Sequence, residues 1–496
     1  MMLDPCDWDE TRAIGREMMD DMLTWLETVR DRPTWTSVPA DAKARLDEAV
    51  PYAGSPLGDV YQAFKRDVLP YPTGNVHPRF WGWVMGTGTT TGVLADFLAA
   101  GMNNHLAGYD QSAALIERRV VAWLVELMGF PKDASGLLVS GGTEANLNGL
   151  MAARVAKAGF DVREEGLRAG PQLTCYGGAE THSWIYKACE SMSLGRKAFR
   201  ASPVDADYRV DVAACRARIV ADIAAGDRPF AIIGNAGTVS TGATDDLNAL
   251  RDLADEFDLW LHVDGAFGAL AAWTESRAIV SGLERADSVA FDLHKWGYMP
   301  YEVGVALTRS PGAQTATYQT ASAGAPAYLQ SAQAGIAVDT TYFADRGFQL
   351  SRGFRALKVW MSMKEQGVDR IAGAIQMNID QARRLGALVD AHPDLELLAP
   401  VSLNIVCFRY APGGMAEQAL NPLNQATLVA LQSRGIAVPS QTVLQGRFAI
   451  RVCIANHRSR DEDFDVLIEA VVAIGAELAA GSGQPTGLTL PSAHSA

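Results

Sequence analysis

Between residues 136 and 308 the chain alternates short apolar segments with amphipathic ones, and this alternation restricts its fold more than any other feature. Segments such as PFAIIGNAG (229–237) are apolar along almost their whole length, which is typical of strands buried on both sides. The segments between them, such as DDLNALRDLADEFD (245–258), have helical spacing. The pattern predicts an α/β fold with a mainly parallel sheet covered on both faces. The remaining expected strands are 136–140, 172–176, 259–266, 288–293 and 303–308, and a further expected helix is 211–226.

An N-terminal helical segment precedes this region. Residues 11–32 place Met18, Met22, Trp25 and Leu26 at helical spacing, which gives an apolar stripe without a domain-sized core of its own. We therefore expect this arm to pack on another surface, such as a second subunit.

The C-terminal third predicts a smaller α+β domain. A long helical stretch (351–392) leads into the order strand, helix, strand, helix between residues 402 and 480. The last residues are rich in Gly, Pro and Ser, a composition typical of disorder. We expect four parts, which are a helical arm (1–75), a large domain (76–390), a small α+β domain (391–480) and a disordered tail (481–496).

Charge and cysteine usage exclude several classes of partner. The net charge of −14 argues against a nucleic-acid backbone or an anionic membrane surface. No apolar run reaches the roughly 18 residues of a membrane span, and the N-terminus does not resemble a signal peptide. The six cysteines are scattered without a C-x-x-C pair, so we expect reduced thiols in a cytoplasmic protein and no metal site.

A lysine stands where the strand at 288–293 ends, in SVAFDLHKW. Lysine is seldom buried without a partner, so Lys295 is either a structural ion pair or a snorkelling side chain, or it serves as an amine. Burial lowers the pKa of a lysine and frees its nitrogen to form an imine with an aldehyde. The cofactor aldehyde held in this way is pyridoxal 5'-phosphate (PLP), which also needs an acid for its ring nitrogen, a phosphate site and a group against the ring face.

An acid ends the strand LWLHVD at Asp264. A carboxylate at the C-terminal end of a parallel strand lies where ligands bind in α/β sheets. Paired with a pyridine nitrogen, it keeps the ring protonated. His262 is two residues earlier, on the same face, and is a candidate to brace the acid. The alternative is an ordinary helix-capping aspartate.

The segment LLVSGGTEANL predicts a phosphate site. Gly142 and Thr143 lie between a strand and a helix, where free N–H groups attract an anion. A plain tight turn capped by Thr143 is the alternative. The sequence lacks the Gly-Lys-Ser/Thr of a Walker loop, and GTGTTTG (86–92) lacks the dinucleotide spacing.

His182, in ETHSWIYKA, follows an expected strand, where an imidazole can stack on a pyridine ring and carry a proton. A structural histidine is the alternative. The four signals occur in the order phosphate turn, histidine, His-Val-Asp and His-Lys within one α/β segment, an order hard to obtain by chance.

With these motifs the chain resembles the PLP-dependent group II amino-acid decarboxylases of aspartate-aminotransferase fold, which include aromatic L-amino-acid, histidine and glutamate decarboxylases. The similar stretches cover nearly the whole chain, from GREMMDDMLTWLE to IRVCIANHRSRDEDFD, and HVDGAFG with DLHKW is the most specific pair. The resemblance implies fold type I, with a seven-stranded large PLP-binding domain and a smaller C-terminal domain. It also implies a homodimer that exchanges the N-terminal helix.

The resemblance implies a role for each site residue. Lys295 forms the internal aldimine, and a quinonoid intermediate follows the loss of CO2. Tyr328, in the interval of the family's mobile loop, matches the proton donor, with an ordinary loop tyrosine as the alternative. The catalytic residues are then Lys295, His182, Tyr328 and Asp264; the cofactor-binding residues are Gly142, Thr143, His182, Thr238, Asp264, Ala266, Ser288, His294 and Lys295; and the substrate residues are Trp81, Trp83, His105 and Arg352.

Two departures from the family pattern are Asp292-Leu293 in place of Asn-Pro, and Gly265 after Asp264. The sequence predicts a PLP-dependent carboxy-lyase acting on a small-molecule L-amino acid, with the aromatic residues of HPRFWGW favouring an aromatic substrate. Asn103, Asn104 and His105 leave an acidic or polar substrate open. A decarboxylating aldehyde synthase and a non-catalytic PLP-binding protein are two further hypotheses.

Overall fold

The computed structural model describes residues 3–319, 335–338 and 342–481. Its larger sheet has seven strands in the order β2-β8-β7-β6-β5-β3-β4. All neighbouring strands are parallel except β8, which is antiparallel to both β2 and β7. The bounds are β2 Ser135–Val139, β3 Leu173–Gly178, β4 Phe199–Ser202, β5 Arg228–Asn235, β6 Trp260–Asp264, β7 Ser288–Asp292 and β8 Gly304–Thr308.

Helices cover both faces of this sheet, as the apolar strands predicted. In β5, Ile232 belongs to one buried cluster and its neighbour Ile233 to another, so successive side chains enter different cores. The fold class expected from the sequence is confirmed. The helices of this part are α4 Thr90–Met102, α5 Ser112–Leu127, α6 Gly142–Lys157, α7 Trp184–Ser191, α8 Val212–Ala224, α9 Leu247–Glu256, α10 Ala313–Tyr318 and α11 Ala356–Gln366.

A second, five-stranded sheet has the order β1-β11-β12-β10-β9, and its buried side is packed by helices of the C-terminal part. Its first strand, β1, comes from far earlier in the chain and pairs in parallel with β11. The elements are β1 Phe80–Trp81, β9 Leu395–Leu397, β10 Ile405–Tyr410, β11 Val438–Leu444, β12 Arg447–Cys453, α13 Glu417–Ser433 and α14 Asp461–Ala479.

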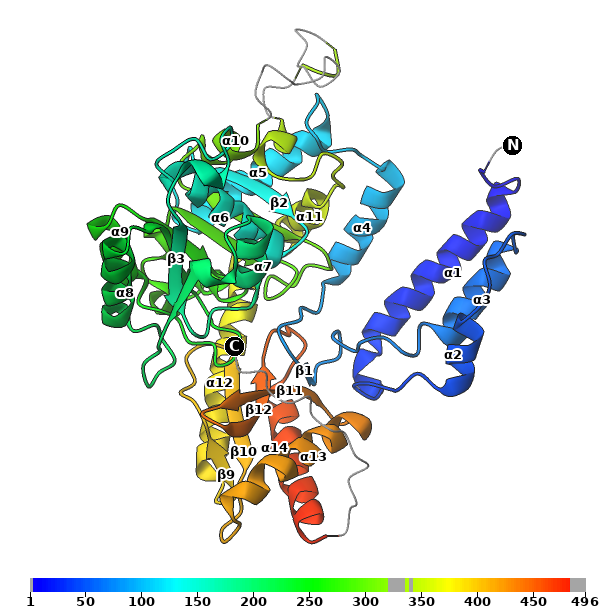
Figure 1. Cartoon of the computed structure of the whole chain (residues 1–496). Helices are drawn as coiled ribbons and strands as arrows, with labels where there is room; N and C mark the ends of the chain where they lie inside the picture. Colours follow the sequence, from blue (N-terminus) through cyan, green and yellow to red (C-terminus); the bar gives the residue numbers. More distant parts are fainter. Residues whose placement is uncertain (1–2, 320–334, 339–341, 482–496) are drawn as a thin grey trace.

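The long helical stretch expected over residues 351–392 is two helices. Gly367 has φ +74°, a left-handed conformation that favours glycine, and it separates α11 from α12 (Val368–Ala391). The second helix runs from the larger part of the molecule down to the smaller one (Figure 1).

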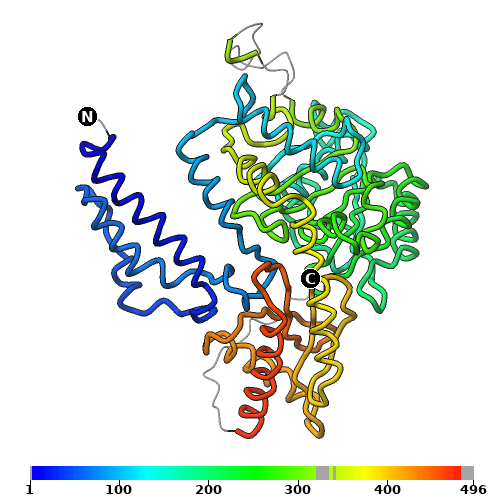
Figure 2. Tube along the Cα trace, turned by 180° about the vertical axis from the view of Figure 1, so that it is seen from behind, coloured from blue at the N-terminus to red at the C-terminus, as the bar shows by residue number. Residues whose placement is uncertain are grey.

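The N-terminal helices stand to one side of the sheets in both views (Figures 1 and 2). They are α1 Trp8–Glu27, α2 Ala40–Leu46 and α3 Leu57–Asp67, and α1 has no buried residue. An ion pair of 2.8 Å between Arg30, in the turn after α1, and Asp463 connects this arm to the start of α14. Among the described residues, no helix is long and apolar enough to cross a membrane.

Candidate active site

The carboxyl ends of five strands meet at one edge of the larger sheet. Strands β3, β5, β6 and β7 run parallel, and β2 has the same direction as β7 because both are antiparallel to β8. The loops that leave this edge therefore lie close together, which is the usual ligand position in such sheets. They carry Gly142 and Thr143 after β2, His182 after β3, Thr238 after β5, Ala266 after β6, and His294 and Lys295 after β7.

Lys295 forms an ion pair with the last residue of its own strand. Its Nζ lies 2.8 Å from Oδ2 of Asp292, whose side chain is only 1% exposed. Burial acts to lower the pKa of Lys295, but the charge and hydrogen bond of Asp292, supported by Asp264, outweigh it and hold that pKa above its usual value. The expectation that Lys295 has a lowered pKa is therefore wrong.

The glycine turn after β2 packs closely on the lysine segment. A Cβ on Gly142 would lie 2.8 Å from Oδ2 of Asp292, so no side chain fits there. A Cβ on Gly141 would lie 3.2 Å from the ring of His294. The Nδ1 atom of His294 accepts the N–H of Val303 at 3.1 Å, and burial lowers the pKa of this histidine despite Asp292. The backbone at the start of α6 and His294 thus form a small polar cradle, in which Thr143 is exposed.

Asp264 ends β6 with both carboxylate oxygens bonded. Its Oδ2 accepts the indole N–H of Trp184 at 2.6 Å, and its Oδ1 accepts the N–H of Ala266 at 3.1 Å. The expected brace, His262, does not contact the acid by a hydrogen bond; it bonds instead to Asn146 at 2.8 Å and Ser288 at 2.7 Å. The sequence prediction of a His262 brace is wrong, because the imidazole points into the layer between β6 and α6.

His182 lies in the loop before α7. Its Nδ1 accepts the N–H of Trp184 at 3.2 Å, which leaves the ring proton on Nε2. The side chain is exposed, but the surrounding protein desolvates it enough to lower its pKa, against the opposing charge of Asp264. Thr238 is buried one loop away, with its hydroxyl 3.1 Å from that of Thr241.

Ser288 does not belong to the cradle. It is the first residue of β7, at the opposite end of the strand from Lys295, and it is fully buried. Its hydroxyl bonds to His262 and accepts the indole N–H of Trp260 at 2.7 Å. The structure therefore does not bring Ser288 together with the other predicted cofactor-binding residues.

Arg352 is also occupied elsewhere. Its guanidinium is paired with Glu117 and donates to the carbonyls of Leu106 (2.9 Å) and Leu138 (2.7 Å). Both charged side chains are buried, with exposures of 1% and 0%. The structure does not support the prediction that Arg352 binds a substrate carboxylate, because Glu117 is already its counter-ion.

The two tryptophans of HPRFWGW lie in different environments. Trp81 is buried in the small-domain core, where it stacks on Phe464 and donates to Ser459 at 3.0 Å, so the structure does not bring it to the predicted site. Trp83 has φ +52° and is 54% exposed, and it lines a cavity of about 420 Å³ with Phe80.

Two further predicted residues stay outside this cluster. His105 is exposed in the loop after α4, with its ring 6.1 Å from that of Tyr109. Tyr328 lies outside the described residues.

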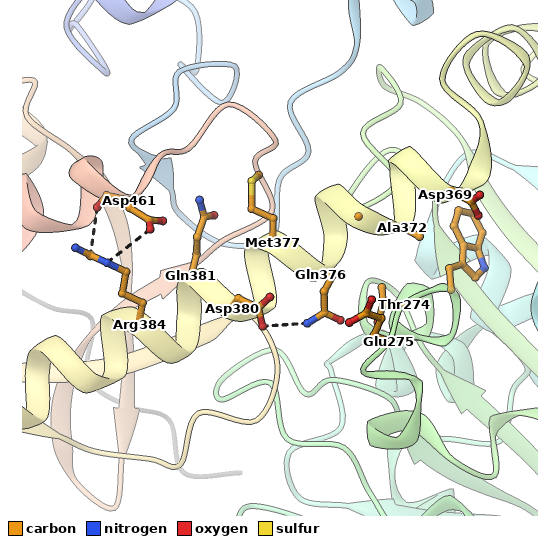
Figure 3. A pocket seen from close by; sticks show the side chains of 12 residues that line it. Thr274, Glu275, Asp369, Ala372, Gln376, Met377, Asp380, Gln381, Arg384 and Asp461 are labelled. Atoms are coloured by element: carbon orange, nitrogen blue, oxygen red, sulfur yellow. Dashed lines mark hydrogen bonds and ion pairs between the residues drawn. The ribbon is translucent and has the colours of Figure 1, made fainter.

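A larger cavity of about 650 Å³ lies along α12, away from the predicted residues (Figure 3). Its wall carries Glu275, Asp369, Asp380 and Asp461 with one arginine, Arg384. A wall dominated by carboxylates does not suit an anionic cofactor, and none of the predicted site residues lines it.

The structure adds three residues to the site that the sequence did not assign. Trp184 contacts Asp264 directly, and Asp292 contacts Lys295. Arg451 donates to the carbonyls of Trp83 (2.7 Å) and Val239 (2.8 Å), and its buried Nη2 has no hydrogen-bond acceptor among the described residues. The sequence already showed that Asp292 replaces the family's Asn, which could have marked it as a site residue. The contacts that Trp184 and Arg451 make depend on the tertiary structure and could not be read from the sequence.

The assembled groups match the requirements of a pyridine aldehyde that carries a phosphate. An amine, a carboxylate, an imidazole and a glycine turn beside a second imidazole meet at one sheet edge, where the buried carboxylate of Asp292 lies beside both the turn and Lys295. Among the described residues, no cluster of three or more His, Cys, Asp or Glu side chains is arranged to hold a metal ion. The residues present therefore fit PLP.

Comparisons with known proteins agree with this geometry. Residues 39–411 match the model of the pyridoxal-dependent decarboxylase conserved domain. An aromatic-L-amino-acid decarboxylase of Bacillus atrophaeus is 33% identical over 475 residues, which are 95% of this chain and 96% of that protein. A phenylacetaldehyde synthase of Arabidopsis thaliana is 28% identical and covers 91% of this chain and 93% of its own length.

A solved structure, that of Oryza sativa TDC with PLP and tryptamine, superposes with a TM-score of 0.88. It is 25% identical and covers 96% of this chain and 100% of its own.

Proposed function

The chain belongs to the pyridoxal-dependent decarboxylase family, and on that premise we propose that it decarboxylates an aromatic L-amino acid to its amine. It is a PLP-dependent amino-acid decarboxylase of aspartate-aminotransferase-like fold. The observation that carries the aromatic preference is Trp83, a large exposed indole beside Phe80 whose carbonyl is held by the cationic Arg451.

We assign the cofactor contacts to residues at the sheet edge. Lys295 holds the cofactor covalently, and Asp264 bonds its ring nitrogen. The backbone at Gly142 and Thr143, with His294, binds its phosphate. Ala266 is assigned to the ring face and Thr238 to the ring oxygen. PLP, when bound, supplies the electron sink for the bond to the departing carboxylate.

Proton transfer is assigned to His182 and Tyr328. The proton on Nε2 of His182 is available toward the site because Nδ1 is engaged by Trp184. Tyr328 replaces the carboxylate with a proton on the substrate carbon, so that the amino acid and one proton give the amine and CO2.

Arg451 takes the place of Arg352 as the candidate for the substrate carboxylate. Arg352 is neutralised by Glu117, whereas no carboxylate forms an ion pair with Arg451 in the described part of the chain. Both arginines have one buried nitrogen without an acceptor there, and Arg451 lies between Trp83 and the loop of Thr238. A guanidinium with a free N–H binds a carboxylate through a charge-assisted hydrogen bond.

The active form is proposed to be a homodimer. Helix α1 has no buried residue, and α4 exposes Phe97, Leu98 and Met102. A second copy would cover these apolar surfaces, which are larger than single scattered exposures. Light scattering after size exclusion is expected to give twice the chain mass of 53.1 kDa. A cytoplasmic location is part of the same proposal, supported by free thiols at all six cysteines.

Two other reactions are alternatives to the proposed one at the same site. The first is decarboxylation of a polar or acidic amino acid, for which the exposed His105 in the loop after α4 is the candidate polar contact. The second is that of an aldehyde synthase, which consumes O2 and water and yields aldehyde, CO2, ammonia and hydrogen peroxide. Tyr328 argues against it, because a proton donor competes with oxygen for the carbanion.

The test is product analysis with added PLP over tyrosine, tryptophan, DOPA, histidine, glutamate and aspartate. Amine and CO2 from an aromatic member support the proposal, and Trp83→Ala should then raise KM for that substrate at least about tenfold. Turnover of only an acidic member contradicts the aromatic assignment. Aldehyde with peroxide contradicts the role of Tyr328.

A further inference from the structure

Trp184 contacts both of the groups that face the cofactor ring in the proposed site. It is the first residue of α7, and its side chain is almost fully buried. Its indole N–H donates to Asp264 at 2.6 Å, and its backbone N–H donates to Nδ1 of His182 at 3.2 Å. One residue therefore orients the carboxylate on β6 and the imidazole in the loop after β3.

The geometry of the carboxylate makes this contact specific. Asp264 has an N–H donor on each oxygen, Trp184 on Oδ2 and the backbone of Ala266 on Oδ1. The two bonds fix the carboxylate plane before any ligand is present. A bond from a neutral donor to a carboxylate also stabilises the charged form, which is the form that a protonated ring nitrogen needs.

The indole is itself held firmly. Its ring packs edge-on against His262, with centroids 5.8 Å apart, and it lies in the buried cluster of α6, α7 and β5. His262 is fixed in turn by Asn146 and Ser288. The donor N–H therefore has little freedom to follow Asp264 if the carboxylate turns.

We propose that Trp184 is a positioning residue whose indole N–H presets Asp264 for the ring nitrogen of PLP. This inference rests on the proposed function, in which Asp264 bonds that nitrogen. In this assignment the side chain of Trp184 acts through Asp264.

The chain offers a matched control. Trp260 is also a buried indole, on the same strand as Asp264, and it donates to Ser288 at 2.7 Å. Trp260→Phe removes a buried indole hydrogen bond of the same kind without touching Asp264. Trp184→Phe removes the bond to Asp264 but keeps the backbone N–H that holds His182.

The experiment measures the affinity of wild type, Trp184→Phe and Trp260→Phe apoenzymes for two probes. The probes are PLP and its 1-deaza analogue, which has carbon in place of the ring nitrogen. We expect wild type to prefer PLP by at least about tenfold, Trp184→Phe to lose most of this preference, and Trp260→Phe to keep it. The pH dependence of the absorption spectrum of bound PLP should be altered in Trp184→Phe and should be the same in wild type and Trp260→Phe.

Each outcome decides between the proposals. A wild-type enzyme without preference for PLP overturns the role of Asp264 and so the proposed cofactor contacts. A wild-type preference that Trp184→Phe retains in full, with an unchanged spectrum, overturns the role of Trp184 alone. If Trp184→Phe does not fold, incorporation of 3-benzothienylalanine at position 184 removes the N–H within the same ring shape, and the same criteria apply.

Discussion

The Nζ atom of Lys295 lies 2.8 Å from Oδ2 of Asp292, a carboxylate three residues earlier that is almost completely buried. The pair holds the lysine at the sheet edge in its charged form and keeps its pKa above the usual value, although burial opposes this. A lysine must lose its proton before it attacks an aldehyde, so in the proposed site the ion pair with Asp292 opposes attachment of the cofactor.

Asp292→Asn should therefore lower the pKa of Lys295 and speed the attachment of PLP to apoenzyme. We expect the rate at pH 7 to rise, since a lower pKa increases the fraction of neutral amine. Stopped-flow absorbance at several pH values measures this rate. An unchanged pH profile would show that Asp292 does not set the protonation of Lys295.

Replacement of Glu117 by Gln should destabilise the fold without weakening substrate binding. The variant leaves the guanidinium of Arg352 buried without its counter-ion, which typically costs about 3–5 kcal/mol. Urea unfolding measures the loss, and KM of the folded fraction serves as the second readout. A large rise in KM with unchanged stability would restore Arg352 as a substrate ligand.

Arg451→Lys should raise KM for the amino acid by about 10- to 100-fold, because a lysine does not reproduce the planar donor set of arginine. The amine product lacks the carboxylate and provides the matched control. Its inhibition constant should change less than about threefold in the variant. Equal losses for amino acid and amine would mean that Arg451 acts only through the backbone of Trp83.

Stability should fall with acid partly through His262. Burial lowers the pKa of this histidine to about 4, whereas an unfolded histidine titrates near 6.5. The unfolded chain then binds more protons between these values, so the contribution is complete above about pH 6.5 and is lost as the pH falls toward 4.

The free energy of unfolding from urea titrations between pH 7.5 and 4.5 measures this effect. His262→Gln should reduce the slope by up to about 1.4 kcal/mol per pH unit, whatever its effect at pH 7.5. A slope equal to that of wild type would assign the acid sensitivity to other groups, such as His77, whose pKa burial also lowers to about 4.

The central cluster was predictable because it follows from strand direction. Asp264 and Lys295 each come at or just after the end of an apolar strand, and parallel strands bring such ends together. The same rule places Ser288 away from the cluster, because it is the first residue of its strand. It begins the strand that Lys295 follows, so strand direction already placed it at the far end, and only the family resemblance suggested otherwise.

The structure departs from the expectations where tertiary contacts override a local pattern. The partner of Arg352, Glu117, is 235 residues away in the chain, and no spacing rule connects them. Trp81 and Trp83 would share a face in a regular strand, but the positive φ of Trp83 breaks the alternation and turns only that indole outward. The antiparallel β8 was likewise not visible in its apolar sequence.

Mapping the covalent attachment site tests the central claim most directly. The holoenzyme is reduced with borohydride to fix the cofactor to its lysine, digested, and analysed by mass spectrometry, with Lys295→Ala as the control. The account predicts the phosphopyridoxyl label on Lys295 alone, and neither label nor decarboxylation in Lys295→Ala. A label on another lysine, or full turnover by Lys295→Ala, would contradict it.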